Sequence, residues 1–355
     1  MSPRDLPPKR RGLSGRFGPA VHAGVALILA MGSLLTITTV ANAAKSDPPS
    51  PLPLGTLTRT SGSDPTCPAG FACQAFTISC PAVTQRAEGF IAIDSPSSPH
   101  GVVALFSGDG GTHYWGSGGT MALGFFSGLL KAGLRLVQVR WTTPWLAAPA
   151  AQGVDPSDLA CRPATVVEWI HDNIYLPLHA HPTLGVCGFC LSGNSGGASQ
   201  VTYPLAFFGL SDKVNAVVPT SGPPHAAIAK GCLLVPGYAY DPQSAQTIDS
   251  SYGFVGMLVN TGPCVHHLST STARWQRDSI DLGGNDFTYP TTRVAFIVGG
   301  LDRTPAPAHA HDLFDKLIQA GSPIVSWQLV PTMQHTITGS ADGLAALSSD
   351  LLASS

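Results

Sequence analysis

The residues with the clearest potential for chemistry lie in the stretch Gly193-Asn194-Ser195-Gly196-Gly197. This G-x-S-x-G pattern is typical of a serine placed on a sharp turn between a strand and a helix. Glycine suits such a turn because a side chain there would clash with the backbone that packs against it. Serine is a weak nucleophile on its own and needs a neighbouring base. The pattern therefore predicts Ser195 as the nucleophile of a covalent mechanism.

An acid and a histidine follow later in the chain, each just beyond an expected strand. Asp302 comes after the apolar run 293–298, and His335 comes after the run 324–330. Functional groups of open α/β sheets gather at the carboxyl ends of the strands, so we expect both side chains near Ser195.

A glycine-rich turn at 107–111 is expected to stabilise the negative oxygen that forms in such a reaction. Oxyanion stabilisation requires backbone N–H donors, and Gly196, the residue after the nucleophile, is expected to supply one. The second donor is expected from the turn, at Asp109 or Gly110. The alternative is that the turn is a plain glycine-rich connection between a strand and a helix.

Residues from about 98 to 350 resemble the α/β-hydrolase superfamily in this motif and in the chain order Ser195, Asp302, His335. The resemblance implies acyl transfer in which His335 takes the proton from Ser195 and Asp302 orients His335 and stabilises its cation. We expect hydrolysis of a carboxylic ester through an acyl-enzyme, without a cofactor or metal ion. The expected substrate is a small-molecule or polymeric ester: a lipid or short-chain ester, a polyhydroxyalkanoate or a plant cell-wall ester. A peptidase and a non-catalytic exported binding protein on the same fold are the alternatives.

Cys190 offers a second nucleophile on the same expected strand. The stretch 188–193, Gly-Phe-Cys-Leu-Ser-Gly, is similar to the cysteine elbow of dienelactone hydrolases. Two residues after the cysteine, however, stands a serine where that elbow has glycine, and the next expected strand is farther away than one helix and a turn require. A trypsin-like protease is also disfavoured, because its histidine precedes its serine, whereas His335 follows Ser195.

Short apolar runs alternate with helical stretches from His100 onward, which predicts parallel strands joined by helical crossovers. We therefore expect an α/β fold with a mostly parallel central sheet and helices on both faces. The expected strands are 101–106, 134–141, 184–191, 214–218, 293–298 and 324–330. The expected helices are 120–132, 163–175, 196–210, 307–320 and a last one near the C-terminus.

The stretch from about 222 to 290 interrupts this rhythm and is rich in Gly, Pro, Ser and Thr. It is too long for an ordinary loop, so we interpret it as an inserted cap or lid. Candidate substrate contacts are the residues that follow the glycine-rich turn and the residue before the nucleophile: His113, Tyr114, Trp115 and Asn194. Each also has a plain structural interpretation, as a wall of the cleft or as a turn residue.

Residues 1–43 have the layout of a secretory signal peptide, with a basic start, an apolar run and the small-residue pattern Ala41-Asn42-Ala43. An uncleaved membrane anchor is the alternative, and the sequence does not separate Sec from Tat export. Residues 44–66 are expected to be a proline-rich linker or N-terminal extension, and 67–355 the hydrolase domain. We therefore expect a secreted protein, extracellular or periplasmic, without a stable membrane span after cleavage.

The chain has 8 cysteines, which in an exported protein predict disulfide bonds without choosing the pairs. Cys187 and Cys190 are three residues apart, and we do not expect them to bond, because such residues point to opposite faces of a strand. Basic residues gather in the expected signal peptide and leave an acidic remainder. This balance excludes the electrostatic footprint of a nucleic-acid-binding protein.

Overall fold

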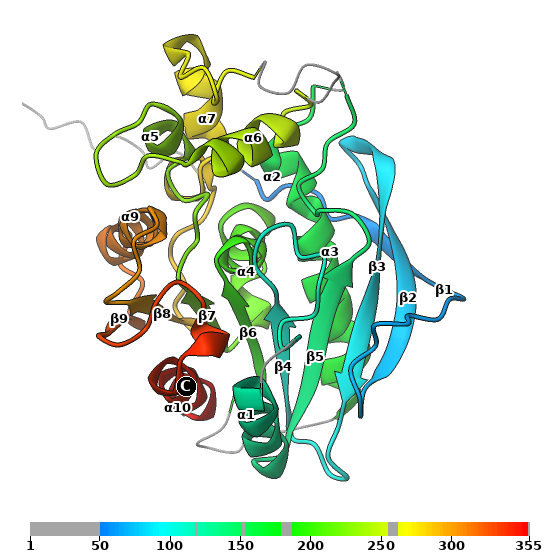
Figure 1. Ribbon diagram of the computed structural model, residues 1–355. Helices are drawn as coiled ribbons and strands as arrows, with labels where there is room; N and C mark the ends of the chain where they lie inside the picture. The colour runs from blue at the N-terminus through cyan, green and yellow to red at the C-terminus, as the bar shows by residue number, and fades with distance from the viewer. Residues whose placement is uncertain (1–49, 118–119, 151–152, 179–186, 255–261, 354–355) are drawn as a thin grey trace, which may run out of the picture. The chain divides into compact units, whose positions relative to one another are not determined.

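The computed structural model describes residues 50–117, 120–150, 153–178, 187–254 and 262–353 (Figure 1). The expected signal peptide at 1–43 and the start of the expected linker, up to residue 49, lie outside these residues. The described residues all belong to one unit.

A sheet of nine strands forms the centre of this unit within the described residues. The strands are β1 Thr56–Thr60, β2 Ala72–Cys80, β3 Val83–Asp94, β4 Gly101–Phe106, β5 Leu134–Trp141, β6 Phe189–Asn194, β7 Ala216–Thr220, β8 Arg293–Gly299 and β9 Val325–Val330. Their order across the sheet is β1-β2-β3-β5-β4-β6-β7-β8-β9. The strands from β5 to β9 pair in parallel, whereas β1, β2 and β3 pair antiparallel, and β3 also pairs antiparallel with β5. The prediction of a mostly parallel sheet is confirmed.

Helices cover both faces of the sheet, as expected (Figure 1). They are α1 Thr120–Lys131, α2 Pro156–Leu159, α3 Cys161–Ile170, α4 Gly196–Phe208, α5 Ile228–Cys232, α6 Pro242–Ser251, α7 Thr272–Asp278, α8 Ile280–Gly283, α9 Ala306–Gln319 and α10 Ala341–Leu352. Apolar residues of α1 and α10 share one buried cluster with one face of the sheet. Residues of α3, α4 and α9 share a second cluster with the other face.

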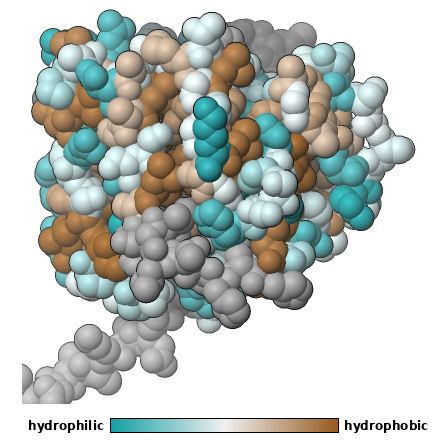
Figure 2. Space-filling model, turned by 90° about the horizontal axis from the view of Figure 1, so that it is seen from below, coloured by the Kyte–Doolittle hydropathy of each residue, from teal (hydrophilic) through white to brown (hydrophobic). Residues whose placement is uncertain are grey.

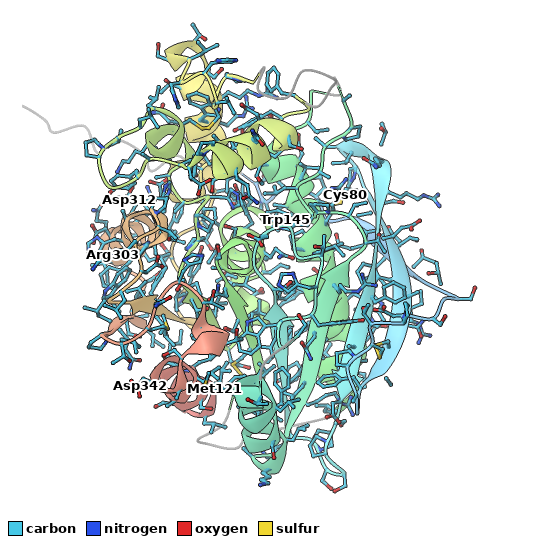
Figure 3. All side chains as sticks on the ribbon, in the orientation of Figure 1. Cys80, Met121, Trp145, Arg303, Asp312 and Asp342 are labelled. Carbon is cyan, nitrogen blue, oxygen red and sulfur yellow. A yellow bond between two sulfur atoms is a disulfide. The ribbon has the colours of Figure 1, made fainter. Side chains whose placement is uncertain are left out.

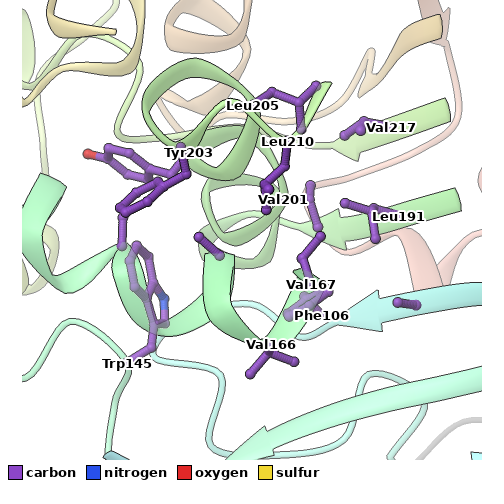
Figure 4. Close-up of a cluster of buried hydrophobic side chains, with 14 of the residues drawn as sticks. Phe106, Trp145, Val166, Val167, Leu191, Val201, Tyr203, Leu205, Leu210 and Val217 are labelled. Carbon is purple, nitrogen blue, oxygen red and sulfur yellow. The ribbon is translucent and has the colours of Figure 1, made fainter. Parts of the chain in front are cut away.

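Strand β4 shows why this sequence forms a two-sided sheet. Its residues are all buried, and successive side chains of a strand point to opposite faces. Val102, Ala104 and Phe106 belong to the cluster under α3 and α4, whereas Val103 and Leu105 belong to the cluster under α1 and α10. Figure 4 shows part of the first cluster, in which apolar side chains of helices and strands pack against one another.

The strand that leads to Ser195 begins and ends later than the predicted range 184–191. Strand β6 spans Phe189–Asn194, and residues 184–186 lie outside the described residues. The polar stretch after Leu191 continues the strand because its backbone pairs with β7, with Ser192 opposite Val218 and Asn194 opposite Thr220. The predicted end of this strand was too early, because the prediction followed the apolar residues alone.

The N-terminal part of the unit contains three strands that the sequence analysis did not predict. The described part of the expected linker includes β1, which pairs antiparallel with β2. The N–H of Leu52 also donates to the carbonyl of Phe207, at 2.7 Å. Strands β2 and β3 alternate between buried and exposed residues and add to the sheet beside β5. Residues 50–66 are thus attached to the sheet and to α4. This corrects the expectation that they form a linker outside the folded domain.

All eight cysteines are paired, as Cys67–Cys73, Cys80–Cys161, Cys187–Cys190 and Cys232–Cys264. The expectation that Cys187 and Cys190 would not bond is wrong. Cys187 precedes β6 and does not lie on it, so the rule of alternating strand faces does not apply to this pair. Both residues are buried in the same cluster, on the α1 side of the sheet.

The segment from 222 to 290 runs between β7 and β8 and carries α5 to α8 in its described part. It has a small apolar core of its own: Ile228, Ala229, Cys232, Tyr240, Ala245, Ile248, Tyr252, Cys264 and Trp275. Asp312 on α9, labelled in Figure 3, accepts hydrogen bonds from Lys230 and Tyr238 of this segment, at 2.6 and 2.8 Å. We refer to it as the inserted segment; its role as a lid stays a prediction.

The outer surface mixes apolar and polar side chains where Figure 2 views it from below. Exposed apolar residues include Met121 and Leu123 of α1. Within the described ranges, no helix combines the length and the apolar character that crossing a bilayer requires.

Candidate active site

Ser195 lies on the turn between β6 and α4. Its backbone has φ 55° and ψ −121°, a strained combination for a residue with a side chain. The adjacent glycines have no space for side chains: a Cβ at Gly193 would lie 2.2 Å from the carbonyl oxygen of Gly197, and a Cβ at Gly197 would lie 2.2 Å from that of Phe106. The predicted strand-to-helix turn is therefore present, and it holds Ser195 at the carboxyl end of the sheet.

His335 and Asp302 form a hydrogen-bonded pair on the loops that follow β9 and β8. Nδ1 of His335 lies 2.9 Å from Oδ2 of Asp302. The Asp302 side chain is fully buried, and the His335 side chain is 30% exposed. A proton on Nδ1 in this bond leaves Nε2 as the acceptor nitrogen of the ring. The pair thus has the contact that an orienting acid makes with a base.

Thr304 holds the second oxygen of the Asp302 carboxylate. Its backbone N–H and its hydroxyl donate to Oδ1 of Asp302, at 2.9 and 2.8 Å. Burial opposes ionisation of Asp302, but the hydrogen bonds from His335 and Thr304 outweigh it and hold the pKa of Asp302 below its ordinary value. Asp302 is therefore ionised at neutral pH, and its charge lies directly beside the His335 ring.

Ser195 and His335 line two cavities. The first, of about 290 Å³, we call the α6 cavity; its other lining residues are Asp109, Gly110, Gly196, Pro224, His225, Tyr240, Asp241, Gln243, Ser244, Thr247, Ile248, Thr304, Pro305 and Ala306. The second, of about 130 Å³, we call the Trp115 cavity; its other lining residues are Ser107, Gly108, Asp109, His113, Trp115, Asn194, Thr336 and Thr338. Two cavities at one serine leave room for two parts of a single substrate.

The glycine-rich turn after β4 packs directly on the start of α4. A Cβ at Gly196 would lie 2.2 Å from the carbonyl oxygen of Asp109, so only glycine fits. Asp109 has a positive φ of 50° and lines both cavities. The carbonyl of Gly110 accepts the N–H of Trp145, at 3.0 Å, and Gly110 lines the α6 cavity. The turn that carries both predicted second donors therefore lies next to Gly196.

The predicted substrate contacts divide into two groups. His113, Trp115 and Asn194 line the Trp115 cavity. The Asn194 side chain also has a structural task, because its Oδ1 accepts the N–H of Ile337 at 3.2 Å and so ties the turn at Ser195 to the loop of His335. Tyr114 is buried and lines neither cavity.

Cys190 does not have a free thiol. It is fully buried on β6 and bonded to Cys187. A disulfide sulfur is not a nucleophile, because attack requires the thiolate. The structure thus overturns the hypothesis of a Cys190-dependent enzyme.

Sequence reasoning missed two residues at this site, Thr304 and His225. Thr304 lies two residues after Asp302, a spacing at which hydroxyl side chains often bond to a carboxylate. His225 follows β7, whose carboxyl end lies beside that of β6. The signal that could have found His225 was its position just beyond a strand end, the rule that located Asp302 and His335.

Comparisons with known proteins give distant structural similarity only. No protein-family model matches the chain, and no curated protein matches it. Among solved structures, a dienelactone hydrolase from Anabaena variabilis is 16% identical, with a TM-score of 0.43 over 79% of this chain and 97% of that one. Est1E from Butyrivibrio proteoclasticus is 13% identical, with a TM-score of 0.45 over 77% and 98%. A truncated carbohydrate esterase from gut microbiota is 13% identical, with a TM-score of 0.49 over 74% and 89%.

The strand order and the turn at Ser195 define the fold without help from these distant matches. A mostly parallel sheet flanked by helices carries a serine on a sharp strand-to-helix turn, with an acid and a histidine after later strands. This is the arrangement of the α/β-hydrolase fold.

Proposed function

We propose that this protein is a serine hydrolase that cleaves carboxylic esters through an acyl-enzyme. The observation that carries the proposal is the hydrogen bond between His335 and the buried Asp302. His335 also lines the same two cavities as Ser195, whose backbone is strained. A strained serine beside a base that is oriented by an ionised acid is the arrangement that activates a hydroxyl for acyl transfer.

In this mechanism the Oγ atom of Ser195 attacks the ester carbonyl while its proton passes to Nε2 of His335. The tetrahedral intermediate collapses when the bond to the alcohol oxygen breaks and His335 returns the proton to that oxygen. A water molecule, deprotonated by His335, then attacks the acyl-enzyme and releases the acid and Ser195. Asp302 stays ionised throughout and stabilises the imidazolium.

The oxyanion is assigned to the N–H groups of Gly196 and Asp109. Gly196 follows the nucleophile and begins α4. Asp109 is preferred over Gly110 because it packs against Gly196 and lines both cavities at Ser195. Loss of one such donor raises the barrier by about 3 kcal/mol.

The proposal includes export. The layout of residues 1–43 and four disulfide bonds in the described chain are compatible with an oxidising compartment outside the cytoplasm. Expression in the native host followed by N-terminal sequencing of the secreted protein tests this part. A mature chain that starts near Ala44 supports it, and a cell-retained full-length chain contradicts it.

The first test of the mechanism is covalent labelling. A fluorophosphonate probe is expected to add to Ser195, as located by intact mass and peptide mapping. Ser195→Ala is expected to abolish both labelling and hydrolysis of 4-nitrophenyl butyrate while circular dichroism stays unchanged. Ser349→Ala, at an exposed serine of α10, is the matched control and keeps both activities. A folded wild-type chain that neither labels nor hydrolyses esters overturns the proposal in favour of a non-catalytic protein.

A second variant tests the acid. Asp302→Asn keeps the shape but removes the charge, and the analogous change in a serine protease lowers kcat about 10⁴-fold. We expect a loss of several orders of magnitude in kcat. Asp212→Asn, at an exposed aspartate, is the control with unchanged kcat. A loss of less than about tenfold for Asp302→Asn means that the acid lies elsewhere.

A further inference from the structure

His225 forms part of the wall of the α6 cavity, and its ring is fixed by the groups behind it. Nδ1 lies 2.6 Å from Oγ of Ser199 on α4. The ring packs edge to face on Trp145, with centroids 6.0 Å apart, and against Tyr203 at 6.4 Å. Figure 4 shows Trp145 and Tyr203 beside each other in the core. Only 5% of His225 is exposed, so its position is set by packing.

The second ring nitrogen of His225 is available to a ligand. No described residue makes a hydrogen bond to Nε2, and the residue lines the cavity that Ser195 and His335 share. Burial, and then the nearby His309, lower the pKa of His225 to about 3, so the imidazole is neutral at physiological pH. A neutral imidazole offers one N–H donor or one nitrogen acceptor at Nε2, depending on which ring nitrogen carries the proton.

The walls of the α6 cavity suit a small oxygen-bearing group better than a long alkyl chain. Polar residues of α6 and of the turn before it line one side: Asp241, Gln243, Ser244 and Thr247. The apolar contribution comes from few side chains, namely Pro224, Tyr240, Ile248, Pro305 and Ala306. A volume of about 290 Å³ is small for a ligand site.

The α6 cavity is placed to receive the acyl half of an ester. Gly196, the proposed oxyanion donor on the carbonyl side, lines this cavity and does not line the Trp115 cavity. The alcohol oxygen must meet His335, which lines both. The Trp115 cavity is therefore left for the alcohol, and the α6 cavity for the acyl chain.

We propose that Nε2 of His225 binds a hydroxyl group on the acyl chain of the substrate, and that the enzyme selects short hydroxyacyl esters over alkyl esters of the same length. The inference rests on the proposed ester hydrolysis and adds a substrate class to it. A hydroxyl fits either protonation of the ring, because it both donates and accepts. His225 is a specificity residue in this proposal; the base of the reaction is His335, which has the carboxylate partner.

The experiment compares two esters that differ in one hydroxyl, 4-nitrophenyl 3-hydroxybutyrate and 4-nitrophenyl butyrate. The wild-type enzyme is expected to have the higher kcat/KM for the hydroxylated ester, by about tenfold, the ordinary worth of one hydrogen bond. His225→Phe keeps a ring of similar size against Trp145 and is expected to erase this preference, so that kcat/KM falls about tenfold more for the hydroxylated ester than for the butyrate. Equal loss on both esters would indicate a purely structural role and overturn the proposal.

Two further variants complete the test. Ser199→Ala leaves the imidazole in place but removes its partner at Nδ1, so we expect a partial loss of the preference for the hydroxylated ester. If His225→Phe does not fold, Ser199→Ala decides the test. An unchanged preference in Ser199→Ala then overturns the proposal. His311→Phe makes the same replacement at an exposed histidine of α9 and keeps the wild-type ratio. Hydrolysis of the butyrate without any preference for the hydroxyl refutes this inference alone. Failure to cleave either ester, with no label on Ser195, refutes the proposed function instead.

Discussion

Two buried carboxylates, Asp64 near the N-terminal strands and Asp281 in the inserted segment, differ in the hydrogen bonds that they accept and in their pKa. Asp64 lies between β1 and β2, and its side chain is fully buried. Tyr114 donates to its Oδ2 at 2.6 Å, Thr66 to its Oδ1 at 2.7 Å, and Arg140 to both oxygens at 3.0 Å. Burial alone would raise the pKa of Asp64, but these hydrogen bonds outweigh it and lower the pKa to about 2.

Asp281, at the start of α8 in the inserted segment, has the opposite balance. It is buried as well, and its Oδ1 has no hydrogen-bond partner among the described residues. Burial, and then the charge of Asp312, raise the pKa of Asp281 to about 7, with Lys230 and Lys316 opposing the rise. Asp278 nearby follows the same trend, since burial and then the charge of Asp155 raise its pKa to about 6.

The N-terminal strands and the inserted segment should therefore respond differently to pH. The strands are attached through a carboxylate that is ionised at any pH above about 4, so that attachment is constant near neutrality. The inserted segment contains carboxyl groups that prefer to be protonated when folded. Its stability must therefore decrease as the pH rises from about 4 to about 7, between the unfolded and the folded pKa of these groups.

The largest effect is expected from the disulfides of the two regions. Cys232–Cys264 closes 32 residues within the inserted segment, and Cys67–Cys73 closes 6 residues near Asp64. In the chain-entropy model a loop of about 15 residues gives about 3 kcal/mol, so replacing both cysteines of the longer loop by alanine costs more than this and the shorter pair costs less. Urea denaturation of the two double variants measures the difference. Equal losses would show that the inserted segment does not depend on its disulfide more than the strands do.

The charge of Asp64 gives the next prediction. Asp64→Asn leaves the guanidinium of Arg140 without its carboxylate and is expected to cost about 3 kcal/mol in the free energy of unfolding at neutral pH. The wild-type contribution should persist down to about pH 4 and disappear as the pH falls through about 2, because the folded pKa lies below the unfolded one. Asp94→Asn, at the end of β3, is the control. A loss below about 1 kcal/mol would mean that Asp64 does not anchor the strands.

The smallest effect has the opposite sign. Asp281→Asn removes a carboxyl whose folded pKa is raised, so the variant should be more stable than the wild type, and its advantage should grow by about 2 kcal/mol from about pH 5 to about pH 8. Thermal unfolding at both pH values measures this change, with Asp212→Asn as the exposed control. An advantage that is the same at both pH values would contradict the raised pKa.

The sequence was sufficient for the parts of the molecule that follow a local rule. Parallel strands bury both faces, so their continuous apolar runs were visible, and the polar residues just beyond them, Asp302 and His335, could be located by the strand ends alone. The turn at Ser195 was recognisable in the sequence because only glycine fits at the positions around the serine. These features depend on a few adjacent residues and on the geometry common to all parallel sheets.

The remaining features depend on contacts between distant residues. Strands β1 to β3 are partly exposed and polar, so the apolar runs that marked the other strands were missing there. The bond between Cys187 and Cys190 depends on where β6 begins, which is settled by pairing with β4 and β7. The His225 ring is held by Ser199, Trp145 and Tyr203, which meet only in the folded chain.

The inserted segment leaves the sheet at the end of β7 and returns at the start of β8, two strands that pair directly with each other. Its two ends are therefore fixed by the sheet, whatever its interior contains. The entropy of closing such a loop grows only with the logarithm of its length, by about 0.6 kcal/mol for each doubling. Insertions and deletions within this segment should thus cost the sheet little, and one wall of the α6 cavity can be rebuilt in evolution while Ser195, Asp302 and His335 stay in place.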